Sequence, residues 1–386
     1  MILSILFWLC AFVIGWGMIG YKYSLLILDK IFKNRRNKND YSYRPMVSVM
    51  IVAHNEEKVI REKLDNVINN NYPKDKIEYI VASDNSTDNT NSIVKHFIKE
   101  HPEIKLYLHE TKEHKGKTNA QNEAQKKTNG EILIMTDANS MFEENSISEL
   151  VSSFNNSDVA YVSGRLQYIN ADKSTTANSE SAYWEGELKL REIESNISSI
   201  TAGNGAIYAC RNSEYFDFEP IKCHDSSMPI YFASQGKRAI YNHKAVAYEK
   251  AGENIADEFK RKVRMNREIV PMIRNGIETL NIKKYGWFSY FYFGHRTCRY
   301  LLGISHVFLF LFNFCLAFKS KFYRVCFLLQ SIFYILGILG HIFKTRNKYI
   351  SLIYYYCITI FAQLVAIKKY FNGESKAIWD KAESTR

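Results

Sequence analysis

Apolar segments of membrane length lie at both ends of this 386-residue chain, and a long polar stretch separates them. The first segment runs from Ile2 to about Leu28 and contains few polar residues. Three more close the chain, at roughly Arg299–Phe318, Phe322–Phe343 and Tyr349–Ile367. Each approaches the ~20 residues that a helix needs to cross a bilayer. The pattern predicts a transmembrane anchor at residues 1–28 and a C-terminal transmembrane region of about three helices at 299–369.

The first apolar segment has the features of an anchor that stays in the protein. No basic residue precedes it and no small-residue cleavage site follows it, in contrast to a secretory signal. Basic residues come soon after it: Lys30, Lys33, Arg35, Arg36 and Lys38. Because positive charge favours the cytoplasmic side, we expect a multi-pass protein of the cell membrane whose polar domain is cytoplasmic. The connectors between the C-terminal segments are basic too, so charge leaves the location of the C-terminus open.

Two segments flank the C-terminal spans. The aromatic stretch Tyr285–His295 follows Lys283 and Lys284, which predicts an interfacial segment at 280–298. Residues 370–386 form a polar tail. The alternative for the apolar C-terminal region is a set of buried helices in a soluble domain.

The polar stretch, residues 45–270, alternates between strand-like and helix-like patterns. Short apolar runs predict buried strands at Val47–Ala53, Ile77–Ala82, Lys105–Leu108 and Ile132–Thr136. Helical patterns separate these runs, and Asn55 is the expected cap of the first helix. Repeated alternation predicts an α/β fold with a largely parallel sheet and helices on both faces. The first strand is not followed by GxGxxG and no P-loop lysine pattern occurs, which argues against dinucleotide oxidoreductases and P-loop NTPases.

Three acidic signatures follow one another along this stretch: Asp84–Asp88, Thr136–Asn139 and His224-Asp225. The first two come directly after predicted strands. Open α/β sheets bind ligands at the carboxyl edge of their strands, so we expect these acids to converge there. Carboxylates gathered at one edge indicate chemistry on a charged, metal-bound substrate.

Composition adds constraints on partners and compartment. Lys plus Arg is 51 and Asp plus Glu is 40, a formal charge of +11. The basic residues beside the first apolar segment favour anionic lipid over nucleic acid as the partner. None of the seven cysteines forms a CxxC pair, so a disulfide framework or a zinc site is not expected and a reduced compartment fits. His109 and His114 are spaced one residue too widely for a metalloprotease helix, and we expect them on a solvated surface.

The motifs of the polar stretch, taken in order, resemble those of glycosyltransferase family 2, a membrane-anchored group with the GT-A fold. The resemblance runs from about Val47 to Arg264. It rests on the following segments: Ala53-His54-Asn55-Glu56-Glu57, Asp84-Asn85-Ser86-Thr87-Asp88, Gly116-Lys117, Asp137-Ala138-Asn139, Gly203-Asn204-Gly205-Ala206, His224-Asp225 and Lys260-Arg261-Lys262-Val263-Arg264. Two positions depart from the family pattern: Asn139 replaces the second metal-motif aspartate, and His224 replaces the first member of the acidic pair. The Arg261–Met265 stretch also lacks the Gln and Trp of the processive synthases.

The resemblance implies an inverting glycosyltransferase that moves a sugar from a nucleotide sugar, expected to be a UDP-sugar. The implied acceptor is a lipid-linked or growing glycan in cell-envelope or exopolysaccharide synthesis, with membrane lipid and envelope-synthesis subunits as further partners. The implied cofactor is Mg2+ or Mn2+. Two alternatives stay open: transfer of a single sugar to a lipid carrier, and an inactive membrane sensor or scaffold for nucleotide sugars.

The resemblance also assigns roles to single residues, each with a structural alternative. Asp225 is the expected general base, the alternative being an exposed loop acid. Asp137, supported by Asn139, is the expected metal ligand, the alternative being a turn at a strand end. The nucleotide sugar is expected to contact these residues: Ala53, Glu56, Asp84, Lys117, Asp137, Arg261 and Arg264. Those expected on the acceptor side are Trp184, Gly203, Asn204, Gly205 and His224.

For several of these residues the two interpretations are close. Asp84 also suits a turn, and Glu56 suits the first turn of a helix. Lys117 also suits a solvated surface. Arg261 and Arg264 share a helix face that would grip a diphosphate or contact lipid headgroups. Trp184 would stack on a sugar or belong to the core.

Overall fold

The computed structural model describes residues 1–32, 37–170, 175–251, 255–343 and 347–378 and shows two compact units. Unit 1 comprises Met1–Ile27, Ile255–Asn281 and Ser289–Ser375, and unit 2 comprises Leu28–Asn254, Ile282–Phe288 and Lys376–Arg386. Lys33, Arg35 and Arg36, on which the expected orientation partly rests, lie outside the described residues, as do residues 379–386 of the polar tail.

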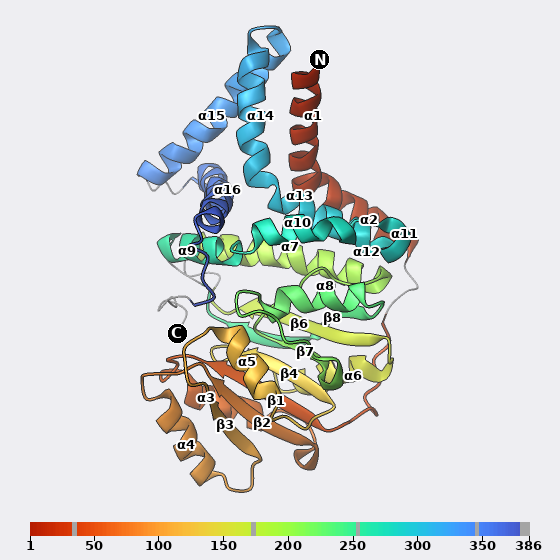
Figure 1. Ribbon diagram of the computed structural model, residues 1–386, viewed down its shortest axis with the longest axis vertical. Coiled ribbons are helices and arrows are strands. Elements are labelled where there is room, and N and C mark those ends of the chain that lie inside the picture. Colours follow the sequence, from red (N-terminus) through yellow and green to blue (C-terminus); the bar gives the residue numbers. More distant parts are fainter. Residues whose placement is uncertain (33–36, 171–174, 252–254, 344–346, 379–386) are drawn as a thin grey trace. The chain divides into compact units, whose positions relative to one another are not determined.

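The strands predicted from the sequence form one half of the sheet in unit 2 (Figure 1). β1 (Val47–Ala53), β2 (Ile77–Ser83), β3 (Leu106–Glu110) and β4 (Ile132–Asp137) lie in the order β3-β2-β1-β4, and all neighbouring pairs are parallel. Every residue of β1 and β2 is buried, as their continuous apolar character requires. Parallel pairing brings the carboxyl ends of these strands to one edge.

The other half of the sheet is mixed. It contains β5 (Met141–Phe142), β6 (Val159–Tyr168), β7 (Tyr208–Arg211) and β8 (Arg238–Glu249), and the full order is β3-β2-β1-β4-β7-β6-β8-β5. β7 runs antiparallel to both β4 and β6, whereas β6 and β8 are parallel. The antiparallel β7 departs from simple strand-helix alternation and brings the segment before it, residues 203–207, back to the carboxyl end of β4.

Helices cover both faces of the sheet, as expected. Val49 and Ile51 of β1 belong to the cluster that packs on α3 (Ile60–Ile68), α4 (Thr90–Glu100) and α6 (Ser146–Ser152). Met50 and Val52 of the same strand belong to the cluster on the opposite face. That cluster packs on α5 (Lys117–Gln125), α7 (Thr175–Ile197) and α8 (His224–Ser234). Alternation of side chains along a strand therefore builds two cores from one apolar run.

The role expected for Asn55 is wrong. α3 begins only at Ile60, and Asn55 lies in the left-handed region with φ 55°. Its side-chain oxygen accepts hydrogen bonds from the backbone N–H groups of Thr87 (2.7 Å) and Asp88 (3.3 Å). Asn tolerates this conformation better than most residues, and here its side chain holds the 84–88 turn next to β1.

Unit 1 contains the apolar helices. They are α1 (Ile2–Gly15), a π-helical turn (Trp16–Gly20), α2 (Tyr21–Ile31), α14 (Leu302–Ala317), α15 (Lys321–Phe343) and α16 (Lys348–Phe371). Among the described residues, three continuous helices are long and apolar enough to cross a membrane: Ile2–Ile31, Lys321–Phe343 and Tyr349–Phe371. The expected span at Arg299–Phe318 is instead part of a bent pair, Trp287–Tyr300 and Leu302–Ala317, which meet at 61°.

Small residues allow two of these helices to pack closely. A Cβ on Gly337 would lie 2.7 Å from the Cys357 sulfur, and one on Gly340 would lie 3.0 Å from Cβ of Tyr354. Glycine at such positions is typical of helix contacts in membranes. The outward residues Leu328, Leu329 and Ile338 of α15 are exposed, which fits a lipid-facing surface.

Shorter elements complete the chain. The remaining helices are α9 (Ile255–Met265), α10 (Ile269–Thr279), α11 (Ile282–Tyr285), α12 (Trp287–Phe291) and α13 (Cys298–Tyr300). A π-helical segment (Tyr292–Thr297) and 3-10 turns at Lys74–Lys76, Ser153–Asn155 and Asn212–Glu214 are also present.

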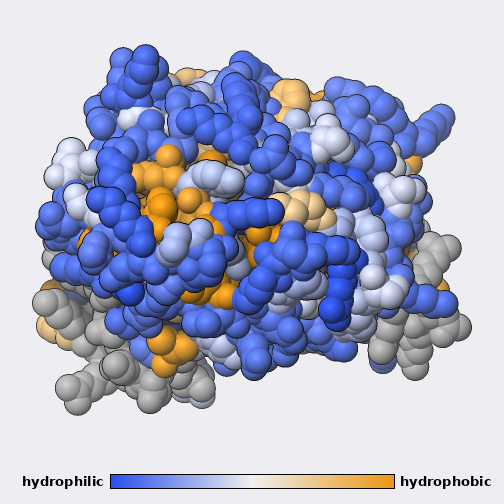
Figure 2. Space-filling view, turned by 90° about the horizontal axis from the view of Figure 1, so that it is seen from below, coloured by the Kyte–Doolittle hydropathy of each residue, from blue (hydrophilic) through white to orange (hydrophobic). Residues whose placement is uncertain are grey.

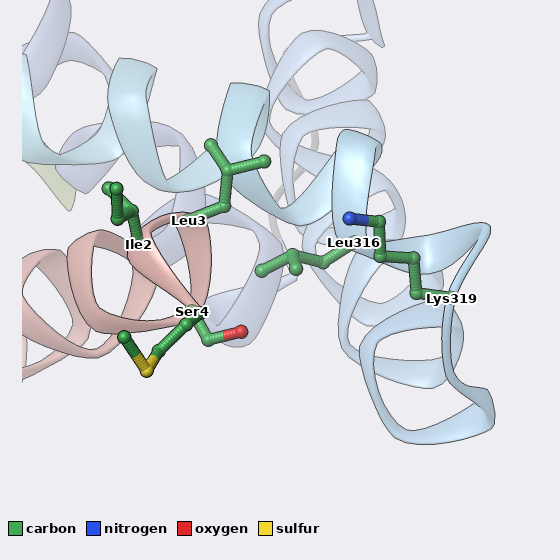
Figure 3. A pocket seen from close by; sticks show the side chains of 6 residues that line it. Ile2, Leu3, Ser4, Leu316 and Lys319 are labelled. Atoms are coloured by element: carbon green, nitrogen blue, oxygen red, sulfur yellow. The ribbon is translucent and has the colours of Figure 1, made fainter.

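The surfaces of the two units differ in character. The face drawn in Figure 2, which belongs mainly to unit 2, is largely hydrophilic, with hydrophobic side chains gathered left of centre and scattered elsewhere. Unit 1 has a hollow between the start of α1 and the end of α14, lined by Ile2, Leu3, Ser4, Leu316 and Lys319 (Figure 3). None of the site residues expected from the sequence lines that hollow.

Candidate active site

Asp84, directly after β2, anchors the loop that precedes α5. Its side chain is buried, and its carboxylate accepts hydrogen bonds from the backbone N–H groups of Lys115 (3.1 Å) and Gly116 (2.8 Å). The Nδ1 atom of His114 lies 2.8 Å from the same carboxylate. Gly116 has φ 98°, a conformation that favours glycine, and immediately precedes Lys117. Asp84 therefore holds the loop at 115–116 in place, and so fixes the position of Lys117 at the start of α5.

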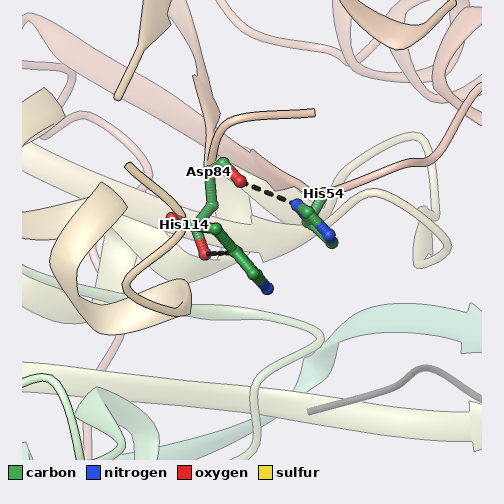
Figure 4. A group of neighbouring side chains, drawn as sticks. All are labelled: His54, Asp84 and His114. Carbon is green, nitrogen blue, oxygen red and sulfur yellow. Dashed lines mark hydrogen bonds and ion pairs between the residues drawn. The ribbon is translucent and has the colours of Figure 1, made fainter. Parts of the chain in front are cut away.

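Two histidines lie face to face beside Asp84 (Figure 4). The rings of His54 and His114 are 3.8 Å apart between centroids and tilted by only 8°. Nδ1 of His54 lies 2.7 Å from the backbone carbonyl of Asp84, so both rings are held by the same residue. The expectation that His109 and His114 are solvated is wrong: His114 packs here, and His109 is buried with Nε2 3.2 Å from Glu123.

Lys117 and Asp137 form an ion pair at the edge of the sheet. The Lys117 ammonium donates to Oδ1 of Asp137, the last residue of β4, and both side chains are only partly exposed. Burial disfavours the charged lysine, but the carboxylates of Asp137 and Asp225 outweigh it and raise the pKa of Lys117 above its ordinary value. The positive charge of Lys117 therefore pairs with the second acidic signature and lies near the third.

Asp225, the second residue of α8, is bonded through its backbone to the loop Gly203-Asn204-Gly205-Ala206, called the glycine loop below. Its carbonyl accepts a hydrogen bond from the N–H of Gly203 (2.7 Å). Burial raises the pKa of Tyr161 and Tyr208, and the nearby Asp225 carboxylate raises both further. Within the part of the chain that the structure describes, no side chain donates a hydrogen bond to this carboxylate. Asp225 is thus held in place by its main chain while its side chain stays available.

The glycine loop closes over the ion pair. A Cβ on Gly205 would lie 2.9 Å from Nζ of Lys117 and 3.0 Å from Oδ2 of Asp137. A Cβ on Gly203 would lie 1.9 Å from the hydroxyl of Tyr161, so this position has no room for a side chain. The side-chain amide of Asn204 is used in internal hydrogen bonds. It donates to the Gly164 carbonyl (2.7 Å) and accepts from the N–H of Ile207 (3.1 Å).

His224 is part of a buried hydrogen-bonded chain. Its Nδ1 lies 2.9 Å from the amide oxygen of Gln121, and its Nε2 lies 2.8 Å from the hydroxyl of Tyr215. An amide oxygen accepts, so Nδ1 carries the proton. Nε2 faces the hydroxyl of Tyr215, which also donates to the amide oxygen of Asn122 (2.9 Å). Burial, together with the charge of Lys117, lowers the pKa of His224 to about 3. The residue is therefore neutral at physiological pH and supports the start of α8.

The other residues expected at the donor and metal site lie on the same loops. Ala53 ends β1, and its carbonyl accepts from the N–H of Asp84 (2.9 Å). Glu56 is buried, and its N–H donates to the hydroxyl of Thr90 (2.7 Å). Asn139, two residues after Asp137, has a half-buried amide with no partner among the described side chains.

Trp184, on α7, packs against both core clusters, and the guanidinium carbon of Arg191 lies 4.8 Å from its ring centroid. Its indole N–H is buried without a hydrogen-bond partner among the described residues. Sugar stacking by this ring stays a prediction.

Arg261 and Arg264 lie on α9, in unit 1. Arg261 donates to the buried carboxylate of Glu258 on the same helix (2.7 Å). A grip of these arginines on a diphosphate stays a prediction.

Lys63 is a neighbour of the metal motif that sequence reasoning missed. It is fully buried on α3, and its ammonium donates to the hydroxyl of Thr136 (3.0 Å) and to the carbonyl of Ser140. Burial lowers its pKa to about 7, against the opposing charges of Asp137 and Glu249. The available signal was its place on the apolar face of α3, between Ile60 and Val67 at helical spacing.

The donor set around Asp137 fits a hard divalent cation. Asp137 supplies carboxylate oxygens and Asn139 a neutral amide oxygen, the ligand types that Mg2+ and Mn2+ prefer. Asp137 already holds one cation, the ammonium of Lys117, which shows that its carboxylate is oriented to bind positive charge.

Comparison with known proteins gives the same assignment. The family Glycosyl transferase family 2 matches residues 48–215. The chain is similar to the probable glycosyltransferase YdaM of Bacillus subtilis, with 36% identity over 157 residues, 40% of this chain and 37% of the relative. It is similar to the beta-monoglucosyldiacylglycerol synthase of Nostoc sp., with 28% identity over 163 residues, 42% of this chain and 35% of the relative.

A third relative is the poly-beta-1,6-N-acetyl-D-glucosamine synthase of Staphylococcus epidermidis, with 27% identity over 138 residues, 36% of this chain and 32% of the relative. The matches thus span about a third of the length of these relatives. Among solved structures, the mannosyltransferase PcManGT from Pyrobaculum calidifontis, in complex with GDP-Man and Mn2+, has a similar fold. Its TM-score is 0.73 at 21% identity, covering 96% of this chain and 99% of that one.

The order of the motifs, their convergence at one sheet edge and these similarities agree. Residues 48–215 therefore match glycosyl transferase family 2, and the chain has the GT-A fold.

Proposed function

We propose that this chain is an inverting glycosyltransferase that moves a sugar from a nucleotide sugar, expected to be a UDP-sugar, to a lipid-linked or growing glycan. One observation carries the proposal: the Lys117 ammonium pairs with Asp137 at the carboxyl edge of the sheet, beside Gly205, and lies near enough to Asp225 for that carboxylate to raise its pKa. A cation-binding acid and a second, available acid at one edge are what transfer from a diphosphate leaving group requires.

Asp225 is the proposed general base. Its carboxylate would take the proton of the acceptor hydroxyl while that oxygen attacks the anomeric carbon. A single base without a nucleophilic carboxylate implies direct displacement, and hence inversion. The neutral His224 next to it would not compete for the proton, because its pKa lies near 3.

Asp137 and Asn139 are the proposed ligands of Mg2+ or Mn2+. The bound ion would offset the negative charge that grows on the leaving diphosphate. PcManGT was solved with Mn2+ and a nucleotide sugar, which supports this assignment. Asp84, Ala53 and Glu56 are the proposed wall of the nucleoside site. The acceptor would approach from the side of Trp184 and the 203–205 loop.

The proposed acceptor class draws on the relatives. One is named as a glycolipid synthase and another as a synthase of a poly-N-acetylglucosamine. The apolar helices of unit 1 support a multi-pass membrane protein, with the GT-A domain proposed at 45–270 and in the cytoplasm. The proposed outer segments are an anchor at 1–28, an interfacial segment at 280–298, spans at 299–369 and a polar tail at 370–386.

The test is donor turnover by the detergent-purified full chain. A panel of UDP-sugars and GDP-mannose is incubated with Mn2+ or with EDTA, and release of nucleoside diphosphate is measured. We expect metal-dependent release with one donor, and its loss in Asp137→Asn and Asp225→Asn. Asp65→Asn is the matched control, because Asp65 is exposed on α3 and pairs with Arg61. Metal-independent release that is unaffected by both site variants would refute the proposal.

The length of the product distinguishes two forms of this activity. The absence of the Gln and Trp near Arg261–Met265 favours transfer of a single sugar to a lipid carrier over unaided polymerisation. Mass spectrometry of the glycolipid product would separate one added sugar from many. Binding of a nucleotide sugar without any turnover would instead favour the sensor or scaffold.

A further inference from the structure

One carboxylate oxygen of Asp137 already accepts from a cationic side chain in this structure. Oδ1 accepts from the Lys117 ammonium, and Oδ2 lies 3.0 Å from where a Cβ of Gly205 would stand. A divalent cation binds carboxylate oxygen at about 2.0–2.6 Å. Beside the ammonium on Oδ1, such an ion would be repelled by a second positive charge. A divalent cation that binds Asp137 through Oδ1 therefore has to displace the side chain of Lys117.

Electrostatics gives the same result. Asp137 and Asp225 together carry two negative charges, and Lys117 already offsets one of them. Adding a divalent ion beside the ammonium would place three positive charges against two negative charges in a partly buried site, where repulsion is weakly screened. Metal binding without donor is thus opposed by a cation that the chain itself supplies.

A donor removes this conflict. The diphosphate of a nucleotide sugar brings anionic oxygens that accept from an ammonium and also bind a divalent ion. Lys117 has a flexible four-carbon stem and starts α5 after Gly116, so its head group is able to move while the helix stays in place. The free energy lost on breaking the ion pair between Lys117 and Asp137 is then offset by a new ion pair between Lys117 and the diphosphate.

We propose that Lys117 is a tethered counter-ion that occupies the cation position at Asp137 in the absence of donor and exchanges onto the donor diphosphate when the metal binds. This rests on the proposed metal-dependent function and adds to it an order of events: metal and donor are taken up together. Lys117 then positions the diphosphate, and its release from Asp137 opens the metal site.

The test measures Mn2+ binding to the detergent-purified full chain without any nucleotide. Electron paramagnetic resonance quantifies the ion that stays free. Lys117→Met removes the competing charge and keeps the length of the side chain. We expect Lys117→Met to bind Mn2+ about tenfold more tightly than the unmodified chain, which corresponds to ~1.4 kcal/mol. Lys117→Arg keeps the charge, and we expect its affinity to stay weak.

Two further variants make the result specific. Lys126→Met is the matched control, because Lys126 lies at the other end of α5 and pairs with the exposed Asp217 (3.2 Å). It should leave Mn2+ affinity unchanged. Asp137→Asn, combined with Lys117→Met, should abolish the tight binding. If Lys117→Met unfolds, judged by its thermal unfolding without metal, Lys117→Gln replaces it.

The possible failures are distinguishable. Equal or weaker Mn2+ binding by Lys117→Met, with binding still dependent on Asp137, would overturn the counter-ion role and leave the proposed function intact. Absence of Asp137-dependent binding in every variant, together with metal-independent sugar transfer, would overturn both.

Discussion

Acidification should destabilise this protein through His224, and the magnitude follows from its surroundings. The residue is 1% exposed and bonded as a neutral imidazole to Gln121 and Tyr215. Its pKa is about 3 in the folded chain, against an ordinary value of 6.5. As the pH falls below 6.5, His224 binds a proton in the unfolded chain but not in the folded chain. The stability of the folded chain therefore decreases with decreasing pH.

Each pH unit of this difference is worth about 1.4 kcal/mol, so the loss between pH 6.5 and pH 5 is roughly 2 kcal/mol. The loss would continue until the pH reaches the folded pKa near 3. For a unit of this size, ~2 kcal/mol corresponds to a decrease of roughly 4–8 °C in the unfolding midpoint. Burial is the larger cause of the lowered pKa of His224, and the charge of Lys117 is the smaller one.

The assay is thermal unfolding of the full chain in detergent at several pH values, compared between the unmodified chain and His224→Asn. Asn cannot be protonated, so we expect the variant to lose this part of the acid-side slope, even if it is less stable at pH 7. His96→Asn is the control, because His96 is exposed and pairs with Glu100 (3.2 Å). Equal slopes below pH 6.5 in His224→Asn and the unmodified chain would show that the folded protein accepts the proton on His224, contrary to this account.

Further predictions concern the site itself. Asp225→Asn should lower the rate of sugar transfer by roughly 10²–10⁴, the usual contribution of a general base, and should leave donor binding measured by calorimetry within a few-fold. Removal of divalent ions with EDTA should stop transfer, and added Mn2+ or Mg2+ should restore it. Gly203→Ala should destabilise the fold by about 1–3 kcal/mol, seen as a lower unfolding midpoint, because its Cβ would clash with the buried hydroxyl of Tyr161. Gly205→Ala should instead leave the midpoint nearly unchanged and weaken Mn2+ binding, because its Cβ would meet mobile side-chain ends of Lys117 and Asp137. A large stability loss in Gly205→Ala with intact metal binding would contradict this assignment.

Most of the parallel half of the fold was predictable from local sequence, because β1, β2 and β4 are buried on both faces. Such strands form continuous apolar runs, as at Val47–Ala53 and Ile132–Asp137, which differ clearly from the amphipathic segments between them. The antiparallel half was not predictable in this way. β7 has only four residues, and its pairing with β4 is a long-range choice that no local pattern encodes.

For the site, the residue types at strand ends were predictable and their partners were not. Asp84 and Asp137 were expected at one edge because parallel strands end together there, and Asp225 was expected beside them from the family resemblance. The role of Lys63 was missed, because a lysine within an apolar helical face gives no indication of what it contacts. His114 was expected on the surface, because its stacking on His54 depends on a loop that Asp84 holds from 30 residues away.

Local sequence was enough to define the two kinds of segment in this protein, the membrane-length apolar helices and the alternating strands and helices with acids at their ends. Both properties are local, since they depend on which residues repeat at helical or strand spacing. Only the tertiary structure brings Lys117 to Asp137, buries His224 in its neutral form and places Gly205 beside the ion pair. These properties depend on burial and on charges brought together from α5, β4 and α8, and burial and charge are set by packing rather than by any one segment.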